Sequence, residues 1–447
     1  MKYISLFLLF LIFPVIIFSN ENPIWLETDS ITAIKNRIIS DFSLSMNDAK
    51  TELIRLYPQI NLDSIDSYAA SKFIEIKIID GEKRMHRKSP RNFKLLNPSL
   101  SNWIGRGANA DTSDIKTVEL IISKAQNPNN HNLGKRICYK FSIDVPYHNF
   151  LVNDTLKVWM PVPIESQRQE NFKIISVSHD NYILSKNQGS EHNTLYIEQG
   201  VDSITSDSIF HFEYVGEYDV YGQYFSPDYI TNNIKPYNKN SEVYKKYTDL
   251  NHKHIICDSL AFTIVGQETC PYRQSELIYE YISKTYPWAG AREYSTIESL
   301  PQYVLDEAHG DCGQVALLYI SLMRTLGVPA RWESGWMLHP WDKNLHDWAE
   351  VYFEGVGWVP VDVSFGRFIS SNDEKVKNFY STGIDYFRFA TNTGICSPLY
   401  PNKKYIRSET VDFQMGEVEC SKGNLFYLGW KKRLEVITIK DICNENK

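Results

Sequence analysis

Hydrophobic and polar residues alternate along much of the chain between residues 134 and 215. This period of two is found in five segments: 137–145, 156–161, 172–178, 194–198 and 208–215. Asn, Asp and Gly residues separate the segments, and no helical spacing lies between them. Short alternating strands joined by turns are typical of antiparallel sheets. We therefore predict a β-sandwich over residues 133–222, and we expect it to act mainly as a scaffold.

The region before the sandwich contains both periodicities. Apolar residues with helical spacing occupy residues 30–57, and Pro58 ends that run. Residues 72–81 then alternate as a strand that closes in an Asp-Gly turn. The pattern predicts a small mixed α/β region over residues 20–132, and we find no candidate chemistry in it.

The second half of the chain changes pattern again. Residues 223–240 are rich in Pro and Asn, which indicates a linker. Helical spacing follows at residues 272–284 and at 314–326, and residues 348–363 alternate on both sides of a Gly-containing turn, as in a β-hairpin. We predict an α+β domain over residues 223–447, including a C-terminal extension.

The first residues have the pattern of an export signal. Lys2 precedes an apolar run over residues 4–18, and Ser19 is a small residue at a plausible cleavage position. We predict a cleaved signal over residues 1–19, with an uncleaved N-terminal anchor as the alternative. The sequence has no second hydrophobic span. We therefore expect an exported protein, periplasmic or extracellular, without stable membrane insertion after cleavage.

Length and charge exclude some classes of partner. A chain of 447 residues suggests about three domains. The net charge of −7 is too mild to indicate binding to nucleic acid or to an anionic membrane. The densest basic stretch, residues 83–94, is interrupted by apolar residues and is typical of a solvated edge. We expect no nucleic-acid partner, and the sequence leaves the oligomeric state unknown.

Seven cysteines occur in the sequence, an odd number that fits one free nucleophile. In an oxidising compartment the other six are able to form disulfides. The pairing cannot be read from the sequence, and the local candidates are Cys257 with Cys270 and Cys396 with Cys420. No cysteine precedes Cys138, which excludes a lipid anchor next to the signal.

Three motifs carry candidate chemistry. Cys312 lies in Gly-Asp-Cys-Gly-Gln, His346 begins His-Asp-Trp-Ala-Glu-Val-Tyr, and Asp362 ends Gly-Trp-Val-Pro-Val-Asp. A thiol, an imidazole and a carboxylate are the parts of a cysteine-nucleophile triad. The alternative for Cys312 alone is a small buried residue at a helix start. The ordered trio favours an enzyme.

The predicted elements bring these groups together. Cys312 lies in the first turn of a helix, where unpaired N–H groups and the helix dipole favour a thiolate. We expect Gly310 and Gly313 to leave open space for a substrate carbonyl. On adjacent antiparallel strands, His346 and Asp362 can come within hydrogen-bond distance. Packing of the helix on this hairpin would bring the thiol to the other ring nitrogen.

These motifs, with Leu-Gly-Val-Pro-Ala-Arg at residues 326–331, resemble the transglutaminase-like superfamily over residues 272–366. The resemblance implies a papain-like α+β core. It also implies that Cys312 is the nucleophile, His346 the general base and acid, and Asp362 the carboxylate that orients the imidazole. The sandwich, above all residues 158–163, is similar to the β-domain that often precedes such cores.

Further roles are expected of residues near these motifs. The backbone N–H of Cys312 would hold the oxyanion together with an upstream donor, for which we predict the indole of Trp288, with Tyr294 as the alternative. Trp336 and Trp341 are expected either to form an apolar wall against the substrate or to belong to the core.

Several neighbouring groups are expected to have no catalytic part. Asp347 should point to the opposite side of its strand and leave the triad unaffected, and His309 and His339 are expected to be structural or to face the substrate. Residues 252–257 contain two histidines and a cysteine, but their spacing fits no known metal site. No acidic run has the spacing of a calcium loop. We expect no metal and no organic cofactor.

The chemistry of the trio defines the class of reaction. A thiolate that attacks an amide carbonyl gives a thioester and releases ammonia or an amine. Water as the second substrate makes the protein a hydrolase, and an amine makes it a cross-linking acyltransferase. We favour hydrolysis of peptide or amide bonds in a peptide or protein substrate. The alternatives are the acyltransferase and a catalytically silent binding module.

Overall fold

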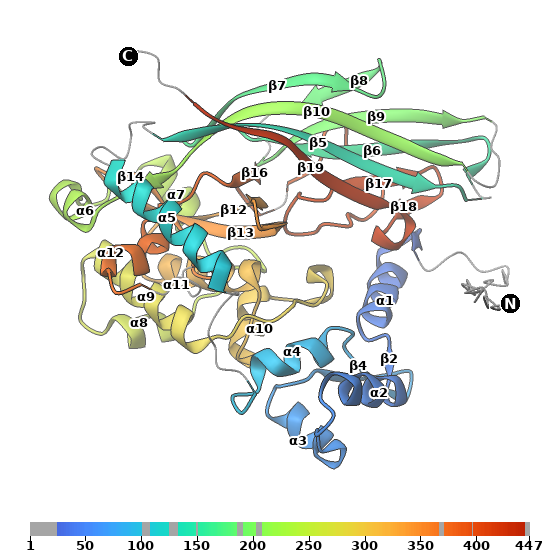
Figure 1. Ribbon diagram of the computed structural model, residues 1–447, viewed down its shortest axis with the longest axis horizontal. Helices are drawn as coiled ribbons and strands as arrows, with labels where there is room; N and C mark the ends of the chain where they lie inside the picture. Colours follow the sequence, from blue (N-terminus) through green and yellow to red (C-terminus); the bar gives the residue numbers. More distant parts are fainter. Residues whose placement is uncertain are drawn as a thin grey trace, which may run out of the picture.

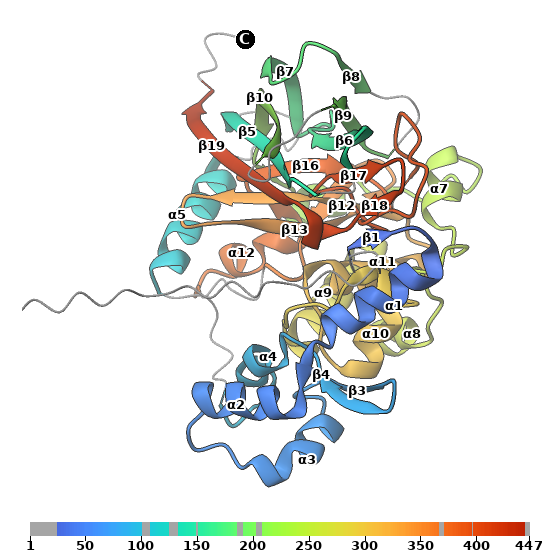
Figure 2. The same ribbon diagram turned by 90° about the vertical axis from the view of Figure 1, so that its right-hand side faces the viewer.

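The computed structural model describes residues 25–100, 108–124, 133–148, 151–185, 191–202, 208–365, 371–395 and 397–442. The predicted signal at residues 1–19 lies outside these ranges. Helices and antiparallel sheets occupy separate layers, so the predicted α+β class is confirmed (Figure 1). A β-sandwich lies on one side of a four-stranded sheet, and helices cover its other side. A small N-terminal region packs below these helices (Figure 2).

The sandwich contains all five of the strands that the alternating pattern predicts. These are β5 (Gly134–Pro146), β6 (Asp154–Val162), β7 (Gln169–Val177), β9 (Asn193–Val201) and β10 (Ile209–Tyr221). The short strand β8 (Tyr182–Ser185) adds a further edge. One sheet has the order β19-β5-β10-β7, in which β19 is Lys431–Asp441. The other has the order β1-β18-β17-β6-β9-β8, in which β1 is Leu26–Glu27, β18 is Gly423–Leu425 and β17 is Glu417–Cys420.

Both sheets of the sandwich also take strands from distant parts of the chain. These are β1 (Leu26–Glu27), β17 (Glu417–Cys420), β18 (Gly423–Leu425) and β19 (Lys431–Asp441). The last three fall in the segment that the sequence pattern assigns to a C-terminal extension of the third domain. Only β19 is longer than four residues, and its partner β5 lies near residue 140. A pattern confined to neighbouring residues does not reveal such pairing.

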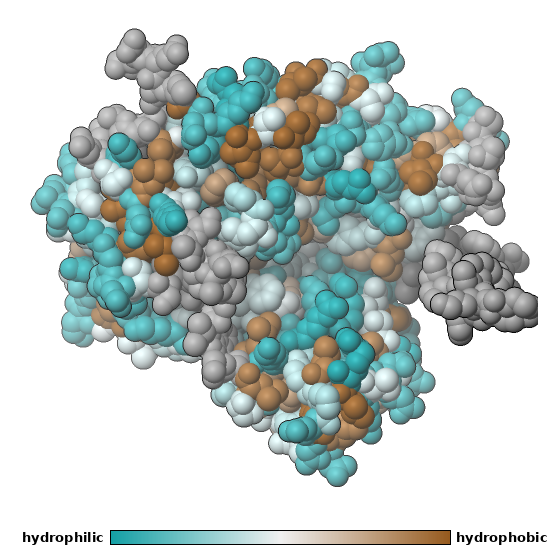
Figure 3. All heavy atoms as spheres, in the orientation of Figure 1, coloured by the Kyte–Doolittle hydropathy of each residue, from teal (hydrophilic) through white to brown (hydrophobic). Residues whose placement is uncertain are grey.

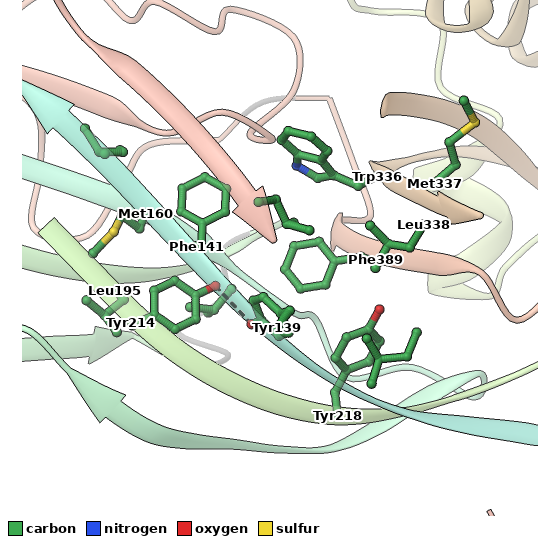
Figure 4. Packing of buried hydrophobic residues seen from close by; sticks show 14 of the residues in the cluster. Tyr139, Phe141, Met160, Leu195, Tyr214, Tyr218, Trp336, Met337, Leu338 and Phe389 are labelled. Carbon is green, nitrogen blue, oxygen red and sulfur yellow. Dashed lines mark hydrogen bonds between the residues drawn. The ribbon is translucent and has the colours of Figure 1, made fainter. Parts of the chain in front are cut away.

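The interior of the sandwich is continuous with the four-stranded sheet. Tyr139 and Tyr214 share a hydrogen bond of 3.0 Å between their hydroxyl groups, and the ring of Phe389 packs against Tyr139 (Figure 4). Trp336 and Leu338 belong to the same buried cluster. Because aromatic and aliphatic side chains from both domains fill one core, the sandwich fixes the position of the sheet that follows.

That sheet has the order β14-β13-β12-β16. Its strands are β12 (Ala330–His339), β13 (Asp342–Phe353), β14 (Gly357–Val361) and β16 (Arg388–Asn392). The predicted hairpin is β13 and β14, although β13 begins before His346. Three helices cover the face opposite the sandwich: α9 (Pro271–Thr285), α10 (Leu300–Glu307) and α11 (Cys312–Thr325). The helix predictions at 272–284 and 314–326 are therefore confirmed.

The N-terminal region divides where the sequence suggested one helical stretch. Helix α1 (Ser30–Asp41) and helix α2 (Met46–Leu56) are separated by the two-residue strand β2 (Leu44–Ser45). Helices α3 (Ile65–Ala70) and α4 (Ser89–Leu96) complete a small core with β3 (Ile76–Ile79) and β4 (Glu82–Met85). The predicted Asp-Gly turn joins β3 to β4, and both of its residues have positive φ angles, 50° and 86°.

The remaining elements connect or cover these layers. They are α5 (Ala108–Lys124), β11 (Gln223–Tyr224), α6 (Pro227–Asn233), α7 (Glu242–Tyr247), α8 (Leu260–Val265), α12 (Glu374–Lys377) and β15 (Gly383–Ile384). The linker predicted at 223–240 contains β11 and α6. Helix α6 begins at Pro227, because proline is well tolerated in the first turn of a helix. The face shown in Figure 3 is mostly hydrophilic, with apolar patches over the sandwich and the N-terminal region.

Both predicted disulfides are wrong. Cys257 and Cys270 are free thiols, and α8 lies between them in the chain. Cys420 is also a free thiol, and Cys396 lies outside the described residues. In the part of the chain that the structure describes, no helix is both long and apolar enough to cross a bilayer.

Candidate active site

Cys312 is the first residue of α11, and the sequence around it fixes the helix start. The Asp311 side chain accepts a hydrogen bond of 3.0 Å from the backbone N–H of Gln314. The Gln314 side chain in turn accepts one of 3.0 Å from the backbone N–H of Asp311. Such a reciprocal capping box satisfies two otherwise unpaired N–H groups at the start of a helix. The thiol is therefore carried by a rigid element.

The glycine after the nucleophile lets other side chains approach closely. A Cβ atom at Gly313 would lie 2.4 Å from the Tyr294 hydroxyl, 2.6 Å from Asp347 Oδ2 and 2.8 Å from the Trp332 ring. At Gly310 the added atom would lie 3.0 Å from Val304. The prediction that these glycines leave open space is therefore wrong, because neighbouring side chains occupy that space.

His346 and Asp362 form a buried pair on the hairpin. In the register of the two strands Ala349 faces Val361, so Asp362 follows the end of β14 and reaches His346 diagonally. His346 Nε2 lies 2.6 Å from Asp362 Oδ2. Asp362 Oδ1 accepts hydrogen bonds from the Ser364 hydroxyl at 3.1 Å and from the Phe365 N–H at 2.9 Å. Both oxygens of this carboxylate are thus engaged.

A buried arginine also contacts Asp362. Arg388 comes from β16, and its Nη1 lies 3.1 Å from Asp362 Oδ2, while its Nη2 donates to Asp385 at 2.8 Å. Burial by itself raises the pKa of Asp362, but His346, Arg388 and the Phe365 N–H lower it to about 2. The carboxylate therefore stays ionised throughout the neutral range.

Arg388 escaped the sequence-based prediction because it lies after the recognised motifs. One signal was available. Arg388 interrupts an aromatic and apolar strand, Tyr-Phe-Arg-Phe-Ala, in which a cation needs a buried anion as partner.

The Cys312 thiol contacts a carboxyl group other than Asp362, that of Asp347. Cys312 Sγ donates to Asp347 Oδ2 at 3.5 Å. Ala349 and Val351 pack in the same cluster as the residues of α11, so alternate side chains of β13 that include Asp347 face this helix. The prediction that Asp347 has no effect near the triad is therefore wrong. His346 is on the neighbouring position of the strand, and its ring reaches Asp362.

This contact changes the expected protonation of the thiol. Burial raises the pKa of Cys312 well above its ordinary value, and the charges of Asp347 and Asp311 raise it further. Burial also raises the pKa of Asp347 well above its usual range. The prediction that the helix start favours a thiolate is wrong for this arrangement, because burial and nearby carboxylates outweigh the helix dipole.

Gln414 connects the two neighbouring residues of β13. Its side-chain N–H groups donate to the His346 carbonyl oxygen at 3.1 Å and to Asp347 Oδ1 at 2.5 Å. Its backbone carbonyl oxygen accepts from the Trp336 indole at 2.9 Å. Gln414 is 2% exposed. It lies far beyond the recognised motifs, and no local pattern in the sequence marks it.

The two candidates for the oxyanion donor lie close to the helix start. The backbone at Trp288 forms a β-bridge with Gly310, and the Gly310 N–H donates to the Pro287 carbonyl oxygen at 3.0 Å. The Tyr294 hydroxyl donates to Asp311 Oδ1 at 2.7 Å, so it is already engaged with the helix cap. The role of Trp288 stays a prediction.

The other predicted residues lie away from the thiol contacts. Trp336 is in the main core, which favours the core interpretation, and the Trp341 indole donates to Asp114 of α5 at 3.1 Å. His339 lies between Asp114 and Asp385, at 3.1 and 3.4 Å. His309 is buried beside Tyr303, and burial lowers its pKa to about 4.

The described ranges contain no group of three or more His, Cys, Asp or Glu side chains placed to hold a metal ion. In the histidine stretch at 252–257, His254 Nδ1 instead accepts a hydrogen bond of 3.3 Å from the Leu300 N–H. We assign no ligand role to this stretch.

A family model matches the central part of the chain. Residues 258–363 match the model of the transglutaminase-like superfamily. The uncharacterized protein YebA of Bacillus subtilis is 28% identical over a stretch that covers 14% of this chain and 11% of YebA. The matched part thus spans about a tenth of that relative.

Solved structures also resemble the chain, at low sequence identity. A protein from Cytophaga hutchinsonii, provisionally described as a cysteine protease, is 15% identical, with a TM-score of 0.40 and coverage of 70% of this chain and 90% of that one. The periplasmic domain of TgpA from Pseudomonas aeruginosa is 13% identical, with a TM-score of 0.26 and coverage of 60% and 95%. The family match supports a cysteine-dependent enzyme at the level of the family. Residues 258–363 of this chain are a transglutaminase-like core.

Proposed function

We propose that the protein is an exported, thiol-dependent hydrolase of peptide or amide bonds. The observation that carries the proposal is the buried pair of His346 and Asp362, 2.6 Å apart, with His346 on strand β13, against which the helix of Cys312 packs. A histidine fixed by an ionised carboxylate is the partner that a cysteine nucleophile needs.

The proposed reaction begins at the thiol. Asp362 is hydrogen-bonded to Nε2 of His346. The thiol proton would therefore pass to the other ring nitrogen of His346, Nδ1, as the sulfur attacks the amide carbonyl carbon. The Cys312 backbone N–H and Trp288 would stabilise the oxyanion. His346 then gives this proton to the leaving amine, and the C–N bond breaks to leave a thioester. Water, deprotonated by His346, attacks the thioester and restores the thiol.

An amine in place of water would make the same site a cross-linking acyltransferase. We favour hydrolysis because no acidic sequence with the spacing of a calcium loop suggests the activation known in some animal relatives. A peptide or protein is the expected substrate. Neither reaction requires a metal or organic cofactor.

An isotope and amine competition experiment tests the proposal. The mature protein is incubated with casein in water enriched in ¹⁸O, together with monodansylcadaverine. New carboxyl groups carrying ¹⁸O would support hydrolysis, and dansyl-labelled glutamine side chains would indicate the acyltransferase. Neither product, with no acyl group on Cys312 by intact mass, would contradict both and favour a silent binding module. Cys270→Ala, at another cysteine that is not exposed, is the matched control for Cys312→Ala.

A further inference from the structure

Asp347 occupies an unusual position for a carboxyl group. It is 4% exposed, and its Oδ2 lies 3.5 Å from the sulfur of the proposed nucleophile. Its other oxygen is bonded to Gln414, which is itself 2% exposed. A buried carboxylate and a buried thiolate in contact repel each other strongly, so the two groups together retain a proton at neutral pH. The carboxyl is normally the stronger acid, which leaves this proton on sulfur.

The surroundings of the pair strengthen this distribution. Charged and titratable groups act on the pair from several elements: Asp311 at the helix cap, Tyr294 before α10, Asp362 beyond β14, and Glu409 and Asp412 in the C-terminal segment. His346 directly precedes Asp347 on β13. Lys88 of α4 lies near Asp311 and opposes its charge. Acidic groups outnumber cationic ones in this set, and a second negative charge on sulfur is therefore disfavoured.

We propose that Asp347 is a further catalytic residue that keeps the Cys312 thiol protonated and directed away from His346 in the resting enzyme. Gln414 is the positioning residue that holds Asp347 there. The proposal rests on the proposed role of Cys312 as nucleophile. The S–H bond is directed to Asp347 Oδ2 in the resting state, whereas attack on a carbonyl requires the proton to go to His346. A substrate that separates the thiol from Asp347 would therefore activate the sulfur.

The test is the rate of alkylation of Cys312 by iodoacetamide between pH 5 and 10, measured by site-resolved mass spectrometry. Asp347→Asn retains the shape of the side chain and removes the charge. We expect this variant to react about tenfold faster than the wild type at pH 7, because the thiolate fraction rises. Gln414→Met should change the rate in the same direction by less. Asp342→Asn, at the start of the same strand, is the matched control and should react like the wild type.

The outcomes separate this proposal from the proposed function. Unchanged or slower labelling in Asp347→Asn, in a protein with an unaltered circular dichroism spectrum, would overturn the role of Asp347. If that variant fails to fold, the rate for Gln414→Met decides in the same way. A shift in Asp347→Asn together with full turnover in Cys312→Ala would leave the contact intact as a finding and instead refute the proposed function.

Discussion

Arg388 and His346 contact the same oxygen of Asp362: Arg388 Nη1 lies 3.1 Å from Oδ2, and His346 Nε2 lies 2.6 Å from it. A single carboxylate oxygen thus contacts both the His346 imidazole and the Arg388 guanidinium, and the guanidinium also donates to Asp385. The histidine of the candidate site is therefore connected to a buried ionic network that continues beyond the transglutaminase-like core. A substitution of Arg388 should therefore alter the hydrogen bond between Asp362 and His346, although Arg388 and His346 come from different strands.

Arg388→Met is expected to lower the free energy of unfolding by about 3–5 kcal/mol, because it leaves Asp362 and Asp385 buried without their cation. It should also raise the pKa of Asp362, which Arg388 helps to keep low. Urea unfolding at pH 7 measures the first effect. The higher pKa of Asp362 should appear in the pH profile of turnover: on the acid side, the variant should lose activity at a higher pH than the wild type does. A pH profile that coincides with that of the wild type would contradict this role.

Cys312→Ala should abolish acyl transfer and leave the melting temperature nearly unchanged, because the smaller side chain fits the same helix start.

Asp362→Asn should reduce the turnover number by about 10⁴-fold, by analogy with triads that lose their carboxylate. Steady-state assays of casein turnover measure both. Residual turnover in Cys312→Ala would refute the nucleophile assignment, and an unaltered rate in Asp362→Asn would mean that another group orients His346.

His309 and His86 should make the protein less stable in mild acid. Burial lowers their pKa values to about 4 and about 3, respectively. In the unfolded chain a histidine has a pKa of about 6.5, so it becomes protonated below that pH while the buried histidine of the folded protein stays neutral. The free energy of unfolding therefore falls as the pH decreases from about 6.5 towards 4. Each histidine should cost about 2 kcal/mol at pH 5.

Urea unfolding at pH 5 and at pH 7.5 checks this expectation. In His309→Phe the difference in unfolding free energy between the two values should be smaller than in the wild type by about 2 kcal/mol. An equal difference in both proteins would show that His309 becomes protonated without unfolding.

Asn92 of the N-terminal region should steady the loop that carries Trp288. Its side chain accepts a hydrogen bond of 2.9 Å from the Gly290 N–H and donates one of 3.0 Å to the Gly290 carbonyl oxygen. Asn92→Ala is expected to lower the unfolding free energy by about 1–3 kcal/mol and to speed hydrogen exchange at Gly290. Exchange measured by mass spectrometry on the peptide containing Gly290 tests this, with Asn47→Ala on the exposed side of α2 as the control. Equal exchange in the two variants would rule out a contribution from Asn92.

Local pattern predicted most of the elements near the site. Strands β5, β6, β7, β9 and β10 were predicted from alternation, and the apolar face of α11 and the hairpin that carries His346 follow from their periodicity. These elements depend on residues close in sequence. The elements that carry Cys312, His346 and Asp362 could therefore be inferred from the order of the amino acids alone.

The rest depends on contacts between distant residues. Alternation correctly placed Asp347 on the other side of β13 from His346, but that side faces α11 and so the thiol. Gln414 and Arg388 reach the site from segments without a recognised motif. The open space expected at Gly313 depended on what packs above it, which sequence spacing does not describe.

The C-terminal strands have a consequence for how the molecule is assembled. Strand β19 covers one edge of β5, β17 covers one edge of β6, and Gln414 immediately precedes them in the chain. Until residues 414–441 have been synthesised, β5 and β6 each lack the neighbour that β19 or β17 supplies, and Asp347 lacks its amide partner. Neither the sandwich nor the surroundings of the thiol can therefore be completed before the end of the chain is available, so a chain that ends early should expose unpaired strands and an incomplete site together.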